Sequence, residues 1–138
     1  MSTSDAKIEQ DNLAVVRGAY DRYYAGDLDG FFSVFADDVE LHEADSLPYG
    51  GVYKGIESFR KGIGIMFEAW RDLHFDIEQF TAGGDLVIIY MQLRATGKTT
   101  GKTFSFPVAE VWRLREGKVV EMRPIYWDTH RARECFGS

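Results

Sequence analysis

Two glutamates stand on the apolar faces of predicted strands, where a carboxyl group is costly to bury. Side chains alternate between the two faces of a strand, so Glu43 shares a face with Val39 and Leu41. Glu110 stands in the middle of an apolar and aromatic row on a later strand, two residues before Trp112. A carboxylate in such surroundings must be paired, hydrogen-bonded or protonated. Carboxyl groups tuned in this way are typical general acids and bases.

An arginine is predicted to pair with the second of these glutamates. The segment "REGK" is typical of a two-residue hairpin turn with Glu116 and Gly117 at its centre. If that turn sets the register, Arg123 lies directly opposite Glu110 on the next strand. The pair could act as a substrate clamp, or it could be a structural ion pair within the sheet. Glu43 could likewise be a general base or a solvated carboxylate at a strand end.

Other side chains are candidates for contact with a substrate. Trp127 stands near the end of the last predicted strand, where it could meet a ligand or simply pack in the core. Asp45 and Tyr49 lie on the loop that is expected to cover the mouth of a pocket. The remaining candidates are apolar residues on the inward faces of predicted elements, namely Ile63, Phe67, Met91 and Phe106.

A metal site and a cofactor site are not expected. His42, Glu43 and Asp45 form the densest group of possible ligands. Neighbouring residues on a strand face opposite sides, so His42 and Glu43 cannot converge on one ion without a bulge. Nucleotide-binding glycine motifs, HExxH and CxxC are absent from the sequence.

The elements that carry these residues divide into a helical first half and a strand-rich second half. Apolar residues at helical spacing predict a helix over 8–25, capped by Ser4 or Asp5 and ended by Gly26, and a short helix from Leu28. After a strand over 39–43, a third helix is expected from Gly55 to about Trp70. Gly62 and Gly64 inside it indicate a close approach to the helix backbone.

From residue 73 the apolar period changes to two, which predicts four strands joined by three hairpins. The connections are Gly83-Gly84, a loop over 97–102, and the Glu116-Gly117 turn. Pro107 and Pro124 suggest bends. Helices followed by a curved antiparallel sheet predict an α+β fold, with three N-terminal helices packed into the sheet around an apolar pocket. We expect one domain over 1–138, with residues 1–7 flexible.

Composition limits the kinds of partner. The chain has 138 residues and a formal net charge of −6. An acidic surface repels phosphate backbones and anionic lipid, so nucleic-acid and membrane partners are not expected. No segment is typical of a signal peptide or a membrane span. The single cysteine, Cys135, rules out an internal disulfide and suggests a cytoplasmic location.

Three segments resemble a known family. The segments "GAYDRYYAGDLDGFFSVFADDVELHE", "GVYKGIESF" and "GKVVEMRPIYWD" are similar to the SnoaL-like branch of the nuclear transport factor 2-like superfamily, to which ketosteroid isomerase is related. The resemblance spans roughly residues 8–130. It implies a cone-shaped sheet around helices, with an apolar pocket at the open end, and a homodimer formed through the outer face of the sheet. Because this fold hosts unrelated activities, the resemblance does not specify a reaction.

The resemblance also implies roles for individual residues. Glu43 corresponds to the isomerase base, and Glu110 to the acid that donates a hydrogen bond to an oxyanion. Tyr20 lies one residue out of step with the tyrosine that is the second donor, and Trp127 corresponds to a pocket tryptophan. Arg123 stands where the isomerase has an apolar residue, and beside Glu110 it would hold that carboxylate ionised. An ionised carboxylate cannot donate to an oxyanion, which argues against a simple steroid isomerase.

Two functions remain open from the sequence. The first is a cofactor-independent enzyme that uses Glu43 as the base, with Glu110, Arg123 and Tyr20 orienting a small, mainly apolar substrate for isomerisation, dehydration, cyclisation or hydrolysis. The second is a non-catalytic module that binds a small hydrophobic molecule or assembles through its sheet. Pocket geometry discriminates between them, since an enzyme needs Glu43 and a hydrogen-bond donor at one shared cavity.

Overall fold

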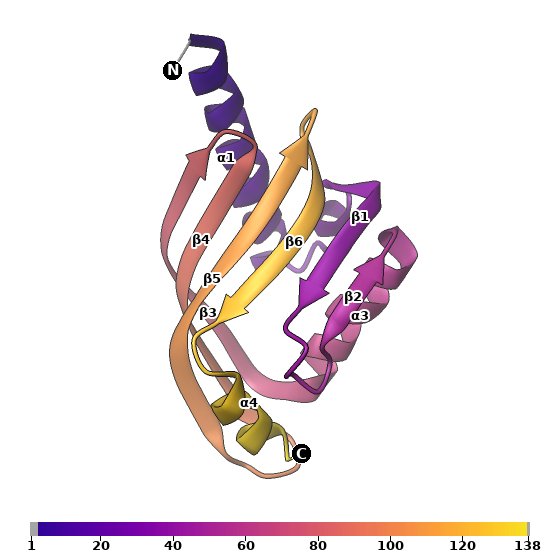
Figure 1. Ribbon diagram of the computed structural model, residues 1–138, viewed down its shortest axis with the longest axis vertical. Helices are drawn as coiled ribbons and strands as arrows, with labels where there is room; N and C mark the ends of the chain where they lie inside the picture. Colours follow the sequence, from indigo (N-terminus) through magenta and orange to yellow (C-terminus); the bar gives the residue numbers. More distant parts are fainter. Residues whose placement is uncertain (1–2, 138) are drawn as a thin grey trace.

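A computed structural model of the protein describes residues 3–137. Within this range the elements follow in the order α1 (Thr3–Tyr24), α2 (Leu28–Phe32), β1 (Phe35–Glu43), β2 (Gly51–Lys54), α3 (Ile56–Ala69), β3 (Trp70–Gly83), β4 (Leu86–Gly97), β5 (Thr103–Arg115), β6 (Lys118–Tyr126) and α4 (Thr129–Phe136). The fold is α+β, with three N-terminal helices and a curved, unclosed sheet, as predicted (Figure 1).

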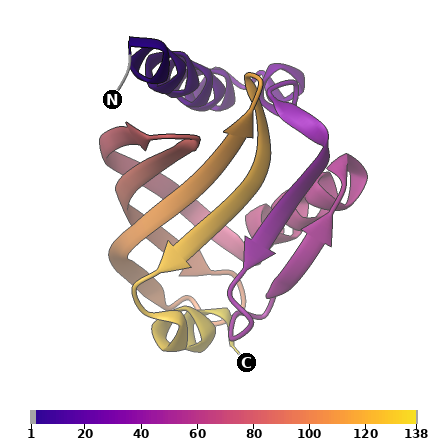
Figure 2. The ribbon, with the colours of Figure 1, turned by 45° about the horizontal axis from the view of Figure 1, so that its top comes forward.

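The six strands form one sheet in the order β2-β1-β6-β5-β4-β3. Neighbouring strands are antiparallel except β1 and β6, which run parallel. The sheet is therefore mixed, whereas a wholly antiparallel sheet was predicted. Strands β3 to β6 are joined by hairpins, which impose antiparallel pairing, but β1 reaches β6 only through the tertiary fold. Figure 2 shows the strong twist and curvature of this sheet.

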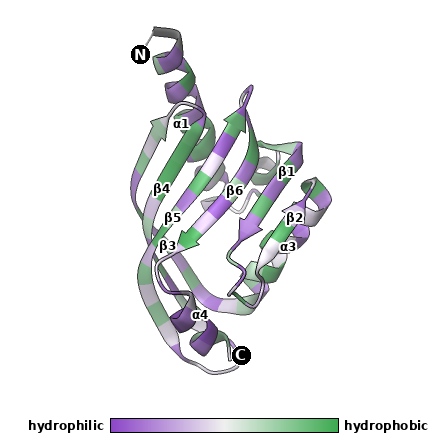
Figure 3. Cartoon of the chain, in the orientation of Figure 1, coloured by the Kyte–Doolittle hydropathy of each residue, from purple (hydrophilic) through white to green (hydrophobic). Residues whose placement is uncertain are grey.

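The three N-terminal helices cover one face of the sheet and enclose the core. Helix α1 packs against β3 and β4, and α3 packs against β1, β2 and β3. Gly26 ends α1 with a φ of +79°, a left-handed conformation that glycine adopts without strain. Along β5 and β6, hydrophobic and hydrophilic residues alternate, as Figure 3 shows, because one face meets the helices and the other faces outward. Between residues 3 and 137, no helix is long and apolar enough to cross a membrane.

Several element boundaries differ from the prediction. Helix α1 begins at Thr3, so Ser4 and Asp5 lie inside the helix rather than in front of it; residues 1–2 of the segment expected to be flexible lie outside the described residues. Strand β1 begins at Phe35, four residues earlier than predicted, and β2 was not predicted at all. Trp70 opens β3 instead of closing the third helix.

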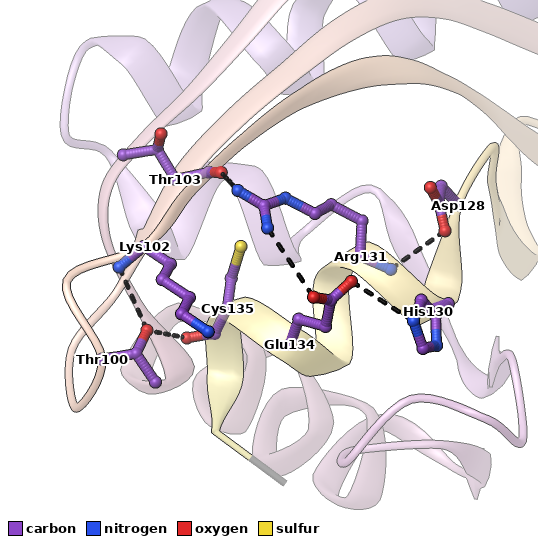
Figure 4. A network of polar contacts seen from close by, with 8 residues as sticks. All are labelled: Thr100, Lys102, Thr103, Asp128, His130, Arg131, Glu134 and Cys135. Atoms are coloured by element: carbon purple, nitrogen blue, oxygen red, sulfur yellow. Dashed lines mark hydrogen bonds and ion pairs between the residues drawn. The ribbon is translucent and has the colours of Figure 1, made fainter.

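Helix α4 was also missed, because it has only eight residues and most of them are polar. Asp128 caps it by accepting a hydrogen bond from the Arg131 backbone N–H at 2.9 Å (Figure 4). The Arg131 side chain donates to the Thr103 carbonyl at 2.7 Å, and Thr100 donates to the Cys135 carbonyl. These contacts hold α4 against β5 and the loop before it. Cys135 is consequently fully buried.

A bulge in β6 overturns the predicted register between β5 and β6. The turn itself is as expected, with positive φ values at both Glu116 and Gly117. Beyond it, Leu114 pairs with Val119 but Arg113 pairs with Glu121, so one extra residue, Val120, stands in β6. A shift of one residue moves every later side chain to the opposite face.

The predicted pairing of Arg123 with Glu110 is therefore wrong. Arg123 lies opposite Val111, and Glu110 lies opposite Pro124. The Arg123 side chain faces outward, where its guanidinium lies 3.4 Å from the Glu121 carboxylate. No arginine lies beside Glu110 to hold it ionised.

The two glycines in α3 provide a matched test of this packing. A Cβ on Gly62 would lie 2.8 Å from Cγ of Tyr53 and 3.0 Å from a methyl carbon of Leu41, whereas a Cβ on Gly64 would meet nothing within 4 Å. We expect Gly62→Ala to lower the free energy of unfolding by about 1–3 kcal/mol because the helix must move off the sheet. Gly64→Ala should raise it by about 0.5–1 kcal/mol through helix propensity. Urea unfolding followed by tryptophan fluorescence measures both, and equal effects would contradict the close approach at Gly62.

Candidate active site

The bulge turns three residues of β6, Met122, Pro124 and Tyr126, toward the helices. Glu110 lies on one side of Pro124, on β5. On the other side, β1 pairs Leu41 with Met122, and the same register continued by two residues brings Glu43 beside Pro124. The two glutamates thus stand on strands that flank β6 and point to the same side of the sheet. Their α-carbons are separated by two strand spacings, about 10 Å.

Both carboxyl groups line one cavity between the helices and the sheet. Its volume is about 40 Å³ when measured as room for the centres of water molecules, and about 10–15 Å³ suffices for one water. The wall is almost entirely apolar and aromatic. The lining residues are Tyr20, Tyr23, Phe31, Leu41, Glu43, Ile63, Met66, Phe67, Phe75, Leu93, Val108, Glu110, Trp112, Met122, Pro124 and Tyr126.

An aromatic wall separates this cavity from a larger hollow on the surface. Tyr23, Phe31, Ile63 and Phe67 line both spaces, and the outer hollow has a volume of about 420 Å³ by the same measure. The rings of Tyr23 and Phe67 are stacked, with centroids 5.4 Å apart. The inner cavity and the outer hollow are therefore adjacent, with Tyr23 and Phe67 at their shared boundary.

Glu110 is held by two hydrogen-bond donors. Both the Tyr20 hydroxyl and the Trp112 indole N–H, the latter at 3.1 Å, donate to the same oxygen, Oε1. Burial raises the pKa of Glu110, and the two hydrogen bonds lower it. The effect of burial is the larger, so the pKa of Glu110 is raised overall. When Glu110 is protonated, the occupied Oε1 leaves Oε2 to carry the proton, and Glu110 becomes a hydrogen-bond donor.

Glu43 has no such support. Its side chain is only 6% exposed, and its Oε1 has no hydrogen-bond partner among the described residues. Burial, and then the charge of Glu110, raise the pKa of Glu43 to about 8. An unpartnered buried carboxyl group is costly to the fold. Its free oxygen and raised pKa are what a general base for a weakly acidic substrate needs.

A third polar group at the cavity is Tyr126. Its hydroxyl lies 2.7 Å from the hydroxyl of Tyr49, which accepts a hydrogen bond from the Trp70 indole N–H at 3.2 Å. Tyr126 was missed as a site residue. The alternation of side chains along the last strand already placed it on one face with Met122 and Pro124, and that face proves to be the inner one.

The predicted site residues fall into three groups. Five of them line the cavity: Tyr20, Glu43, Ile63, Phe67 and Glu110. Three others are buried but do not line the cavity: Tyr49, Met91 and Phe106. The last three face away from the cavity: Asp45, Arg123 and Trp127.

Local structure explains why Trp127 and Asp45 do not reach the cavity. Trp127 follows the last residue of β6 and shares the outward face of Ile125, so its side chain is 78% exposed. Its backbone N–H donates to the Pro107 carbonyl at 3.1 Å. Asp45 is exposed in the turn after β1. Trp127 was predicted at the site from its place near the end of the last strand and from the resemblance, but the bulge at Val120 sets Tyr126 inward in its place.

Possible metal ligands do not gather in this structure. Across residues 3–137, no three His, Cys, Asp or Glu side chains lie together in a way that could hold an ion. His42 faces outward, where its Nε2 lies 2.9 Å from the Glu40 carboxylate and 3.6 Å from that of Glu121.

The chain is an α+β protein with an apolar cavity between its helices and its curved sheet, and sequence comparison identifies its family. The SnoaL-like domain family matches residues 16–122, and the chain belongs to this family. No curated protein matches the chain in sequence.

Solved structures share the fold at low sequence identity. An NTF2-like protein of unknown function from Burkholderia pseudomallei K96243 is 22% identical, with a TM-score of 0.83 over 93% of this chain and 98% of that one. TerC, co-crystallised with polyporic acid, is 21% identical, with a TM-score of 0.80 over 93% and 99%. A putative SnoaL-like polyketide cyclase from Jannaschia sp. CCS1 is 19% identical, with a TM-score of 0.80 over 95% of both chains. At these identities the likeness establishes the fold alone.

The raised pKa of Glu43 predicts the direction in which the free energy of unfolding changes with pH. Because the folded pKa of about 8 exceeds the ordinary value of 4.5, proton binding by Glu43 favours the folded state. This contribution is complete below about pH 4.5 and is lost as the pH rises through 8. We expect the free energy of unfolding of the native protein to fall over this range relative to Glu43→Gln. Denaturant titrations at a series of pH values measure the difference.

A control variant separates this effect from the simple loss of a negative charge. Glu57→Gln removes a carboxylate on the exposed first turn of α3. It should keep the pH dependence of the native protein. If Glu43→Gln also keeps that dependence, Glu43 does not carry a raised pKa.

Proposed function

We propose that the protein is a cofactor-independent acid–base catalyst that acts on a small, mainly apolar molecule with a carbonyl group. One observation carries the proposal: two buried carboxyl groups with different hydrogen bonding share one apolar cavity. Pairs of titratable groups held in different environments are typical of an acid and a base. Isomerisation, or a lyase reaction such as dehydration, is the reaction type that such a pair suits.

Glu43 has the role of base in this proposal. As a carboxylate, its unpartnered Oε1 takes a proton from the carbon next to the substrate carbonyl. The electron pair of that C–H bond forms the enolate, whose negative charge resides on the carbonyl oxygen. Glu43 then returns the proton to another carbon of the conjugated system, which gives an isomer, or the enolate expels a hydroxyl group on the next carbon, which takes the proton from Glu43 and leaves as water. Either sequence leaves the enzyme in its starting state.

Glu110 and Tyr20 have the role of stabilising the enolate oxygen. A protonated Glu110 donates from Oε2, and the Tyr20 hydroxyl strengthens this donor through its hydrogen bond to Oε1. Sequence reasoning argued against this chemistry because Arg123 would hold Glu110 ionised. With Arg123 on the outer face, that objection no longer applies.

Known proteins of this fold support a role with small molecules. Structural neighbours include proteins described as putative SnoaL-like polyketide cyclases, from Jannaschia sp. CCS1 and Mesorhizobium loti. TerC was crystallised with a small molecule, polyporic acid.

A second candidate function is non-catalytic binding of a small apolar molecule. The observation that favours it is the pKa of Glu43 of about 8, which leaves this residue mostly protonated at neutral pH. A protonated carboxyl group is not a base, and the cavity would then be an apolar binding site with hydrogen-bond donors. The two functions differ in what happens when the pH rises.

Hydrogen–deuterium exchange tests the catalytic role without knowledge of the natural substrate. The probe is 2-indanone, a small apolar ketone with weakly acidic C–H bonds beside its carbonyl. We expect the protein to accelerate exchange of these hydrogens in D₂O, with a rate that rises with pH and levels off above about 8, as Glu43 ionises. Glu43→Gln should reduce the rate to that of buffer, and Tyr20→Phe should reduce it about 100-fold. Proton NMR of the ketone measures each rate.

Matched variants make the exchange experiment specific. Glu57→Gln removes an exposed carboxylate, and Tyr53→Phe removes a hydroxyl that does not line the cavity. Both should retain the rate of the native protein. Exchange that survives Glu43→Gln would reject Glu43 as the base. Binding of 2-indanone without exchange at any pH would favour the non-catalytic function.

We also propose a homodimer formed through the outer face of the sheet. An apolar row crosses this face from Tyr90 on β4 through Ala109 on β5 to Ile125 on β6, as the strand register shows. Tyr90 and Ile125 are 43% and 53% exposed, and Trp127 beside them is 78% exposed. Clustered apolar side chains on a sheet face are typical of an interface with another chain. A second copy is the proposed occupant because the outer face is common to all copies and can be self-complementary.

Two isoleucine-to-lysine substitutions, one inside and one outside the apolar row, test the dimer. Ile125→Lys places a charge in the apolar row, whereas Ile65→Lys places one on α3, at a side chain of similar exposure, 48% against 53%. We expect the native protein and Ile65→Lys to be dimers at micromolar concentration, and Ile125→Lys to be a monomer. Multi-angle light scattering measures the mass of each. A monomeric native protein would contradict the dimer.

A further inference from the structure

The cavity contains a hydrogen-bond donor that the proposed reaction does not use. Tyr126 lines the cavity from β6, while Glu43 and Glu110 line it from β1 and β5. The Tyr126 hydroxyl contacts Tyr49 and is not bonded to either carboxyl group. The hydrogen bonds made by Trp70 and Tyr49 determine whether the Tyr126 proton points at Tyr49 or into the cavity.

The indole N–H of Trp70 can only donate a hydrogen bond. It donates to the Tyr49 hydroxyl oxygen at 3.2 Å, and this oxygen also lies 2.7 Å from the hydroxyl of Tyr126. Tyr49 is 3% exposed and does not line the cavity, so Tyr126 is the acceptor that the structure gives to the Tyr49 proton. If Tyr126 donated to Tyr49 instead, the Tyr49 proton would be left buried without a partner, whereas the cavity has room for a water or a ligand atom that accepts the Tyr126 proton.

The favoured direction is therefore from Trp70 to Tyr49, from Tyr49 to Tyr126, and from Tyr126 into the cavity. Burial, and to a lesser degree the nearby Tyr49 and Glu43 groups, raise the pKa of Tyr126, so its hydroxyl keeps its proton. The cavity thus has one donor available at Tyr126 and one acceptor available at Oε1 of Glu43. Both are positioned to meet polar atoms of a ligand.

Tyr126 and Glu110 face different parts of that ligand. Glu110 lies opposite Pro124, and Tyr126 lies two residues further along β6, opposite Val108. Two residues of a strand span about 7 Å, and their side chains lie on the same face. The ligand atoms that meet Glu110 and Tyr126 therefore lie at different positions along the cavity wall.

We infer that Tyr126 is a second hydrogen-bond donor to the substrate, and that the substrate is a mainly apolar molecule with two oxygen functions. One oxygen, a carbonyl, accepts a hydrogen bond from Glu110, whose other oxygen accepts from Tyr20. The other, a hydroxyl or carbonyl, is bound at Tyr126. Tyr49 is a positioning residue, because it directs the Tyr126 proton toward the cavity. The inference deepens the proposed function and depends on it for the identity of the reacting carbonyl.

Binding of small phenols tests the number of oxygen sites. The probes are phenol, benzene-1,3-diol and benzene-1,4-diol, which differ in the number and spacing of their oxygens. One additional hydrogen bond is worth about 1 kcal/mol, or about 5-fold in affinity. We expect at least one diol to bind the native protein about 5-fold more tightly than phenol, as measured by isothermal titration calorimetry. Tyr126→Phe should remove this preference and leave the affinity for phenol unchanged.

Further variants locate the two oxygen sites. Tyr20→Phe should weaken phenol and the diols alike, because it alters the site that all three use. Tyr49→Phe should reduce the preference for the diol, and the affinity for phenol should stay. Tyr53→Phe is the control, because that hydroxyl donates to the Tyr49 backbone carbonyl at 2.9 Å and does not line the cavity. It should keep both the preference and the affinity for phenol.

A measurement on the native protein supports the variants if Tyr126→Phe does not fold. In protein with ¹³C-labelled tyrosine rings, the diol should shift the Tyr126 signal, whereas phenol should not. A diol preference that survives Tyr126→Phe would overturn the inference, as would the absence of any preference, or of any binding, in the native protein.

The proposed function is judged separately by exchange of 2-indanone. Loss of exchange with a retained diol preference would reject the acid–base role and keep the second oxygen site. Exchange of 2-indanone without a diol preference would keep the acid–base role and reject the second oxygen site.

Discussion

Two carboxyl groups enclosed in one apolar cavity form the constraint on which the site depends. An isolated charge is strongly disfavoured in such surroundings, and two like charges are disfavoured further by their repulsion. Among the described residues that line the cavity, none has a basic side chain to neutralise either group. Burial, and then the charge of Glu110, accordingly raise the pKa of Glu43. Acid–base behaviour arises here from burial and not from a neighbouring arginine.

The two groups differ because their hydrogen bonds differ. Glu110 has two donors on one oxygen, which fix its orientation and leave the other oxygen for a proton. Glu43 has a buried oxygen without a hydrogen-bond partner among the described residues, which reduces the stability of the fold. Local departures of this kind from the rules of stable packing are typical of functional sites. The Trp70–Tyr49–Tyr126 chain adds a donor that is likewise incompletely used within the protein.

Much of the fold could be predicted from the sequence because its signals are local. Alternation of side chains predicted the hairpin strands and the inward direction of Glu43 and Glu110. The segment REGK predicted the turn at Glu116-Gly117. Helical spacing predicted α1 to α3, and Gly62 correctly indicated a close approach. The features that were not predicted either depend on contacts between distant segments or have no periodic pattern in the sequence. The parallel pairing of β1 with β6 joins segments far apart in the chain, and α4 is too short and polar for a periodic signal.

The sequence by itself determined which residues are apolar, which carry carboxyl groups and where the chain turns, and these decided that Glu43 and Glu110 face inward. Only the tertiary structure decided what meets them. The single extra residue at Val120 changes the face of every later residue in β6, which turns Arg123 and Trp127 outward and Pro124 and Tyr126 inward. A bulge depends on how the two strands are held by the rest of the sheet, so alternation within one strand could not reveal it. The chemistry of the cavity therefore rests on a register that only the folded sheet specifies.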